Sequence, residues 1–199
     1  MRIQGAVAAL TLTACTDQAP APPTTAATTA RPAPPTASTA PTPTPSATSA
    51  ALPDVTVPPD PPQALNGPAN EDSAEAVARY FMSLFPYMLA TGDTTAWREL
   101  SGESCGYCSR VTGKVADAHA AGRHDEGGQL EFTFGSAMDF ADGTFFATIG
   151  YVEHPSVTKD AAGEVLEEFD GETIRAEIDL EWRDGRWLIQ GVNPNLVEE

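Results

Sequence analysis

Proline is distributed so unevenly along this 199-residue chain that only one part of it can build a folded core. Fifteen of the 18 prolines lie at or before Pro68. A stretch so rich in proline forms neither regular helices nor interior strands, because proline lacks a backbone N–H and has a fixed φ. Charge is distributed in the opposite way: only three of 28 acidic and two of 11 basic residues precede residue 70. The chain therefore divides into a low-charge tether and one acidic domain of about 130 residues.

The tether is expected over residues 15–69, which consist mainly of proline, alanine and threonine. These residues show no apolar periodicity, so they cannot bury enough surface to offset the entropy lost on ordering. We predict a disordered spacer that precedes the domain at residues 70–199.

The domain retains 25 acidic and 9 basic residues, a net charge of −16. Nucleic-acid binding is excluded as a function, because phosphate recognition needs clustered lysine and arginine. The same sign disfavours contact with anionic lipid head groups. The charge serves either solubility or, as the alternative, the binding of a cation.

The first residues have the pattern of an export signal. Arg2 is followed by an uncharged run that ends at Leu12-Thr13-Ala14, directly before Cys15. This pattern is a lipobox, and the run is too short to cross a bilayer. We predict a signal peptide at residues 1–14, lipid on Cys15, and a cell-membrane anchor with the domain on the extracytoplasmic face. The alternative is an ordinary secretory or truncated transmembrane signal with a coincidental cysteine.

Three helices are expected at the start of the domain. Asn70 caps the first, and apolar residues at helical spacing continue to Met88. Pro86 should kink this helix or begin a new one, and Gly92 should end it. Asp93-Thr94-Thr95 caps a short second helix. Ser104 caps a third helix that begins at Cys105 and ends at Gly122, with His119 and the His124-Asp125-Glu126 cluster at its end. Two histidines so placed are expected to be solvated rather than metal-bound.

Strands follow, because the apolar period changes to two after Gly127-Gly128. Turn residues separate the runs, and Asp184-Gly185 is a strong hairpin signal. Helices followed by strands predict an α+β fold with helices on one face of an antiparallel sheet. The expected strands cover residues 130–134, 145–152, a return from Val165, 174–182 and 186–192.

Two resemblances extend this prediction. The element order with Asp184-Gly185-Arg186-Trp187-Leu188-Ile189 resembles the NTF2-like (SnoaL-like) superfamily over residues 70–195, which implies a cone of N-terminal helices on a curved antiparallel sheet. Tyr80-Phe81, Thr91 to Thr94 and Ser104-Cys105-Gly106-Tyr107-Cys108, with the lipobox and tether, resemble an uncharacterised lipoprotein family of high-GC Gram-positive bacteria. Neither resemblance brings an activity, since fold alone does not imply function.

Cys105 and Cys108 are open to three interpretations. A structural disulfide is favoured, because exported proteins meet an oxidising environment and lipid on Cys15 leaves an even pair. A redox-active dithiol at a helix N-terminus is the second, although no βαβ unit surrounds it. A zinc site is the third and is disfavoured, because no second cysteine pair follows.

The favoured function is a non-catalytic module that holds a small ligand or an envelope protein, without cofactor or metal. The alternative is an enzyme with a general base such as Asp93, Asp139 or His154, although each is more simply a cap or an exposed strand-end residue. Aromatic residues are the pocket candidates, with core packing as the competing interpretation for each. They are Tyr80, Phe81, Trp97, Phe134 and Trp182.

Overall fold

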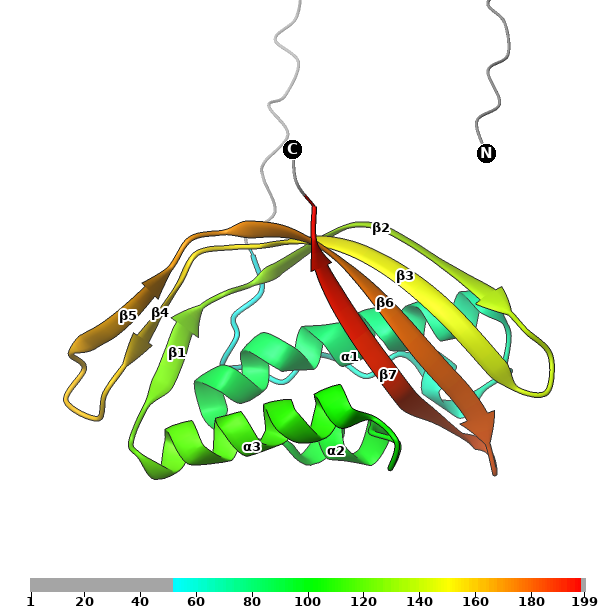
Figure 1. The fold of residues 1–199 in the computed structure, drawn as a ribbon, viewed down its shortest axis with the longest axis horizontal. Coiled ribbons are helices and arrows are strands. Elements are labelled where there is room, and N and C mark those ends of the chain that lie inside the picture. The colour runs from blue at the N-terminus through cyan, green and yellow to red at the C-terminus, as the bar shows by residue number, and fades with distance from the viewer. Residues whose placement is uncertain (1–51, 198–199) are drawn as a thin grey trace, which may run out of the picture. The chain divides into compact units, whose positions relative to one another are not determined.

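A computed structural model describes residues 52–197 of the chain (Figure 1). The predicted signal at residues 1–14 and Cys15 lie outside the described residues. The described part belongs to one unit that runs from Thr48. Its elements are η1 (Gln63–Asn66), α1 (Glu71–Thr91), α2 (Thr95–Leu100), α3 (Gly106–Ala120), β1 (His124–Gly127), β2 (Leu130–Asp139), β3 (Thr144–Glu153), β4 (Ser156–Lys159), β5 (Val165–Phe169), β6 (Glu172–Arg183) and β7 (Arg186–Leu196).

The first helix begins and ends as the sequence predicts. The Asn70 side chain accepts a hydrogen bond from the Ser73 N–H at 2.9 Å, and Gly92 closes the helix with φ of 76°. Pro86 lies inside α1 and does not start a new helix. An interior proline costs about 3 kcal/mol in an isolated helix. Here the buried apolar face of α1 outweighs that cost, since Pro86 is itself buried against the domain.

The caps of the two shorter helices differ in part from expectation. Asp93 Oδ1 accepts a hydrogen bond from the Thr95 N–H at 3.0 Å, as a capping carboxylate should. Cys105, not Ser104, is the N-cap residue of α3, and its Sγ accepts from the Cys108 N–H at 3.2 Å. Ser104 does not cap α3, because its hydroxyl instead donates a hydrogen bond to Gln190 Oε1 on β7.

Four long strands form an antiparallel sheet in the order β2-β3-β6-β7. One face of this sheet is apolar, because alternate residues of β3 and β6 point toward the helices and are buried. All three helices lie against that side of the sheet (Figure 1). The largest fully buried side chains include Trp97, Phe81 and Trp187, so the core lies between the helices and this sheet.

A second, three-stranded sheet continues the first. Its order is β1-β4-β5, and we call it the arm. The chain passes from one sheet to the other at Gly128–Gln129, His154–Pro155 and Asp170–Gly171, which together form a line that we call the crease. Close backbone approach at the crease requires glycine, because a Cβ on Gly127 would lie 2.5 Å from the Pro155 carbonyl oxygen. The result is a curved antiparallel sheet over helices, as predicted (Figure 1).

Two parts of the structure differ from the sequence prediction. His124 to Gly127 form β1, paired with β4, where the sequence predicted only a polar cluster at the end of the third helix. Residues 53–69 were assigned to the disordered tether, but they pack on the domain. Val55 is buried, and the Trp187 indole N–H donates to the Ala64 carbonyl oxygen at 2.9 Å. The domain therefore begins earlier than the predicted residue 70. The sequence does not reveal this, because both contacts depend on residues distant along the chain.

Candidate functional site

A cavity of about 380 Å³ lies along the crease, between the helices and the bend of the sheet. Helix α1 supplies an apolar wall, and α3 supplies one lysine. The crease and the neighbouring strand ends supply most of the polar groups. Its lining residues are Phe85, Pro86, Leu89, Lys114, Asp125, Gly127, Gly128, Glu153, Ser156, Phe169, Asp170 and Glu172.

Two glutamates face each other across strands at this cavity. Glu153 ends β3 and is the register partner of Glu172, which begins β6. Glu153 is half-buried, and Glu172 is exposed at the mouth. Like charges directly opposite each other on antiparallel strands destabilise a sheet. Neither carboxylate makes an ion pair or a side-chain hydrogen bond within residues 52–197, so the repulsion is not relieved inside the described protein.

Burial raises the pKa of the Glu153 carboxyl, and the charges of Glu172 and Asp125 raise it further. Two phenols lie close enough to respond to the same carboxylate. Burial raises the pKa of Tyr107 on α3, with a contribution from Glu153. Burial also raises the pKa of Tyr151 on β3, with contributions from Tyr107 and Glu153. Glu153 is therefore the carboxyl of this cavity whose charge influences the pKa of both neighbouring phenols.

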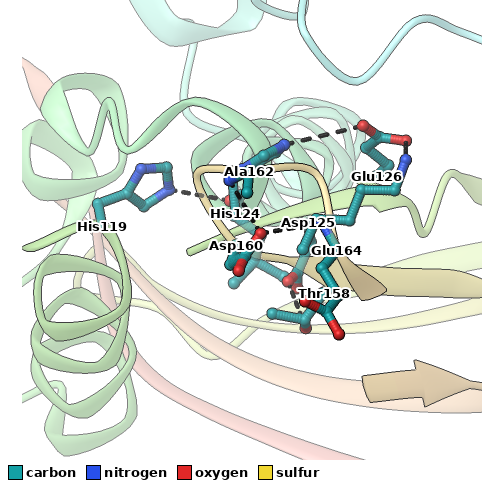
Figure 2. A network of polar contacts seen from close by, with 10 residues as sticks. His119, His124, Asp125, Glu126, Thr158, Asp160, Ala162 and Glu164 are labelled. Carbon is teal, nitrogen blue, oxygen red and sulfur yellow. Dashed lines mark hydrogen bonds and ion pairs between the residues drawn. The ribbon is translucent and has the colours of Figure 1, made fainter. Parts of the chain in front are cut away.

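A polar network holds Asp125 in place on the arm (Figure 2). The Thr158 hydroxyl donates to Asp125 Oδ1 at 2.7 Å, which ties β1 to β4. Lys159, the register partner of His124, reaches diagonally across the same ladder to form an ion pair with Glu126. These contacts leave the second oxygen of Asp125 available to the cavity that the residue lines.

The histidines of this region serve structure. The ring Nε2 of His119 hydrogen-bonds to the Leu89 carbonyl oxygen at 2.9 Å and joins α3 to the end of α1 (Figure 2). His124 faces Glu126, with 3.8 Å between the ring nitrogen and the carboxylate. No group of three or more His, Cys, Asp or Glu side chains in residues 52–197 has the geometry of a metal site.

A second cavity of about 490 Å³ lies beneath the ordered N-terminal segment. Residues 53–60 form one side of it, and Tyr87 of α1 and Phe132 of β2 lie on the other. Pro86 lines both cavities, so they approach α1 from two sides. The second cavity is more apolar than the first, because its charged lining residues are only Asp54 and Asp60.

The five aromatic pocket candidates do not converge on the crease cavity. Phe81 and Trp97 are buried in the core, where their rings stack with centroids 3.9 Å apart. Trp182 packs edge-on against Trp187 at 5.3 Å. Tyr80 is half-buried beside the core. Phe134 is 40% exposed, and the Arg175 guanidinium lies over its ring. All but Phe134 pack in or against the core, because alternate strand residues and one helix face point to the same interior.

The two cysteine sulfurs lie at disulfide distance, as the sequence predicts. Cys105 is 2% and Cys108 is 1% exposed, and the Trp97 indole N–H donates to the Cys108 carbonyl oxygen at 3.3 Å. Thiol–disulfide exchange requires that an attacking thiolate reach a sulfur atom. A bridge buried this far favours the structural role over the redox role.

None of the three predicted catalytic candidates lines the crease cavity, although His154 lies on the crease itself. Asp93 precedes the N-cap residue of α2. Hydrogen bonds from Thr95, and then one from the Tyr87 hydroxyl, lower the pKa of its carboxyl. Asp139 accepts from the Ala141 N–H in the turn after β2. His154 faces Glu131 at 3.2 Å.

Sequence reasoning missed Glu153, although a signal for it was present. Phe145, Ala147, Ile149 and Tyr151 alternate on the inner face of β3. The same period of two places residue 153 on that face. The predicted strand ended at Val152 because the next residues are polar, so the alternation was not extended to Glu153. A charged residue on the apolar face of a strand is the signal that identifies this site.

Helices followed by a curved antiparallel sheet, with a cavity between them, define an α+β domain. The intermembrane space region of the chloroplast protein ARC6 is similar at 12% identity and a TM-score of 0.51, over 67% of this chain and 100% of that chain. An uncharacterised protein with a cystatin-like fold from Caulobacter vibrioides has 12% identity and a TM-score of 0.40, over 61% and 84%. ActVI-ORFA from Streptomyces coelicolor has 16% identity and a TM-score of 0.40, over 61% and 95%. At these identities the likeness concerns the fold alone.

The chain belongs to the family of unknown function DUF6318, which matches residues 45–193. None of the curated proteins is significantly similar to it in sequence. In residues 52–197, no helix is long and apolar enough to cross a membrane.

Proposed function

We propose that this protein is a lipid-anchored, extracytoplasmic lipoprotein of high-GC Gram-positive bacteria whose domain binds a small ligand in the crease cavity. The lipobox at Leu12 to Cys15 and the proline-rich spacer support the anchor. The membrane is thus one partner, and the ligand or an envelope protein is the other. The crease cavity carries the binding function, because it is a concave site with an apolar wall and a few polar groups, as ligand sites commonly are.

The absence of a reactive constellation among the described residues favours binding over catalysis. Asp93, Asp139 and His154 are engaged in local contacts and do not line the cavity. Ser156 is the one hydroxyl among the residues that line the crease cavity, and no histidine lines it. A nucleophile needs a base within hydrogen-bond reach, and the Ser156 hydroxyl makes no hydrogen bond to such a base among residues 52–197.

The anchor is tested by metabolic labelling with a clickable fatty acid. Wild-type protein should acquire the label, and Cys15→Ala should lose it, because the thiol is the acceptor. Cys108→Ala, which leaves Cys15 intact, is the matched control and should remain labelled. Label that persists in Cys15→Ala would contradict the anchor.

The binding function is tested with three probes of one shape: phenethylamine, 2-phenylethanol and phenylacetate. Ligand-observed NMR on the full chain in mild detergent should detect at least one of them. Leu89→Trp and Lys114→Trp, which fill the cavity from α1 and α3, should abolish that signal while the melting transition persists. Binding that is unchanged in both filled variants would place the ligand elsewhere and contradict the proposal.

Glu153 supports a second candidate, an enzyme that uses this carboxyl as a general acid or base. Its raised pKa and its lack of a hydrogen-bonding partner in the described residues are the features of such a group. Mass spectrometry of a small-molecule extract incubated with the protein separates the two functions. An enzyme converts a compound, and Glu153→Gln stops the conversion. A binding module retains a compound unchanged.

A further inference from the structure

We propose that the crease cavity selects a small organic cation: an ammonium group carried on an apolar body. This inference rests on the proposed ligand-binding function and specifies the chemistry of its ligand. Three features of the cavity carry it: the balance of charge, the division of the lining into an acidic and an apolar side, and an unpartnered phenol beside the acidic side.

The charge balance of the lining is strongly acidic. Four carboxylates, Asp125, Glu153, Asp170 and Glu172, line the cavity together with one base, Lys114. Lys114 makes no ion pair within the described residues, so it neutralises none of the four by direct contact. An anionic ligand would meet repulsion here, and a neutral ligand would leave the opposed Glu153 and Glu172 unrelieved. A cation relieves that repulsion.

The carboxylates come from separate elements and do not gather as a metal-binding group. Asp125 belongs to β1 of the arm, Glu153 to β3 and Glu172 to β6. A bare metal ion needs several ligands at about 2–2.6 Å. No set of three acidic or histidine side chains in residues 52–197 meets that requirement. A larger cation that reaches its acceptors through N–H donors fits the wider spacing, since an ammonium group has three such donors.

The opposite side of the cavity is apolar. Phe85 and Leu89 project from adjacent turns of α1, with Pro86 between them. Phe169, which is 45% exposed, lies across the mouth on β5. This wall suits a hydrocarbon or aromatic body attached to the cation, because burial of apolar surface contributes roughly 25 cal/mol per Å². A hydrated inorganic cation would gain nothing from it.

Tyr151 supplies the third feature. The residue is 3% exposed, and its hydroxyl makes no hydrogen bond within the described residues. In residues 52–197, every side-chain nitrogen or oxygen that is closed off from solvent makes a hydrogen bond. Because the Tyr151 hydroxyl makes none, it retains access to solvent. It lies near enough to Glu153 for the carboxylate to raise the pKa of the phenol. The phenol thus lies beside Glu153 on the acidic side, just behind the residues that line the cavity, and adds no charge of its own there at neutral pH.

The three phenyl probes test the inference directly, because each carries its head group on the same phenyl ring with a two-carbon chain, and the head groups are cationic, neutral and anionic. On the full chain, phenethylamine should bind at least tenfold more tightly than 2-phenylethanol, and phenylacetate more weakly still. Glu153→Gln should weaken phenethylamine by about tenfold, since one carboxylate partner is lost. Glu168→Gln on β5 removes the same charge outside the cavity and is the matched control, with a change below twofold. Lys114→Gln should tighten phenethylamine severalfold, because it removes the opposing charge.

Each result separates this inference from the proposed function. If 2-phenylethanol or phenylacetate binds as tightly as the amine and the filled variants abolish it, the cavity is a ligand site but not a cation site. If none of the three binds, both the cation and the ligand-binding proposals fail for this cavity. If the amine binds and Glu168→Gln weakens it as much as Glu153→Gln, general electrostatic attraction explains the binding and the inference is overturned.

Discussion

The four-stranded sheet and the arm follow each other along the chain, because β1 leads into β2, β3 into β4 and β5 into β6. The two sheets are nevertheless packed very differently. In β3 and β6 the inward residues are buried, with Ala147, Ile149 and Ile178 at 0% exposure. All five residues of β5 are exposed, and all four of β4 are only half-buried. The first sheet is covered by helices. In the arm only β1 lies close to α1, and β4 and β5 rely on their hydrogen-bonded ladders and on polar contacts such as Thr158 with Asp125.

This difference teaches where a ligand site can be placed in such a domain. Ligand-binding regions tend to come from the less stable parts of a protein, where local opening costs little free energy. The crease cavity lies at the boundary between the two packing regimes, with its apolar wall on α1 and its carboxylates on strand ends. The core side fixes the wall, and the arm side carries Asp125 and Phe169, which can adjust.

Removal of core volume should affect the two sheets most unequally. Ile178→Ala in β6 should lower the free energy of unfolding by about 2–5 kcal/mol, because it leaves a cavity in a fully packed region. Val165→Ala in β5, where the valine is 44% exposed, should change it by less than about 0.5 kcal/mol. Urea denaturation followed by circular dichroism measures both. Equal losses would show that the arm is as tightly packed as the core.

A β-carbon at the crease should disturb the junction of the two sheets. Gly127→Ala should cost about 2–4 kcal/mol, since φ is 90° and the new Cβ would meet the Pro155 carbonyl oxygen at 2.5 Å. Gly163→Ala has a similar φ of 82° with open space around it, and should cost only about 1–2 kcal/mol. Hydrogen exchange should report faster exchange in β1 and β4 of the first variant. Equal costs would mean that the close approach is not a constraint.

Reduction of the disulfide should weaken the core side without opening the arm. For a loop this short the chain-entropy contribution is about 2 kcal/mol. Cys105→Ala with Cys108→Ala should therefore lower the melting temperature, while amide exchange in β4 and β5 stays unchanged. The same double variant should leave phenethylamine binding within twofold of wild type. A loss of binding would show that the disulfide supports the crease cavity and would contradict a role confined to the core.

Glu153→Gln should have the smallest effect on stability, with the opposite sign. The folded state raises the pKa of Glu153, so between its usual and raised pKa the folded state holds more protons than the unfolded state. Stability from this group is therefore lost as pH rises through that interval. The glutamine variant should melt slightly higher at pH 7 and lose that part of the pH dependence. Thermal unfolding at a series of pH values checks it, and a lower melting temperature at pH 7 would contradict it.

Much of the four-stranded sheet follows from the sequence, and much of the site does not. Ile174 to Trp182 alternates without interruption, so that strand was predictable from its period alone. The arm was not, because β1 reads His-Asp-Glu-Gly and has neither alternation nor β-forming side chains. Its pairing with β4 depends on contacts over 30 residues away. The face of the sheet on which Glu153 lies was predictable from the alternation of β3. Its partner Glu172 was not, because the register between β3 and β6 is fixed only when both strands pair.

The bond between Ala64 and Trp187 determines how the domain receives force through its own N-terminal chain. A chain that joined the domain at Asn70 would pull directly on the cap of α1. Here the Trp187 indole holds the chain six residues earlier, and Val55 is buried earlier still. Tension applied at residue 52 must release these contacts in order before it reaches the helix. The N-terminal segment is therefore the first part of the folded domain to bear tension on the chain, ahead of α1.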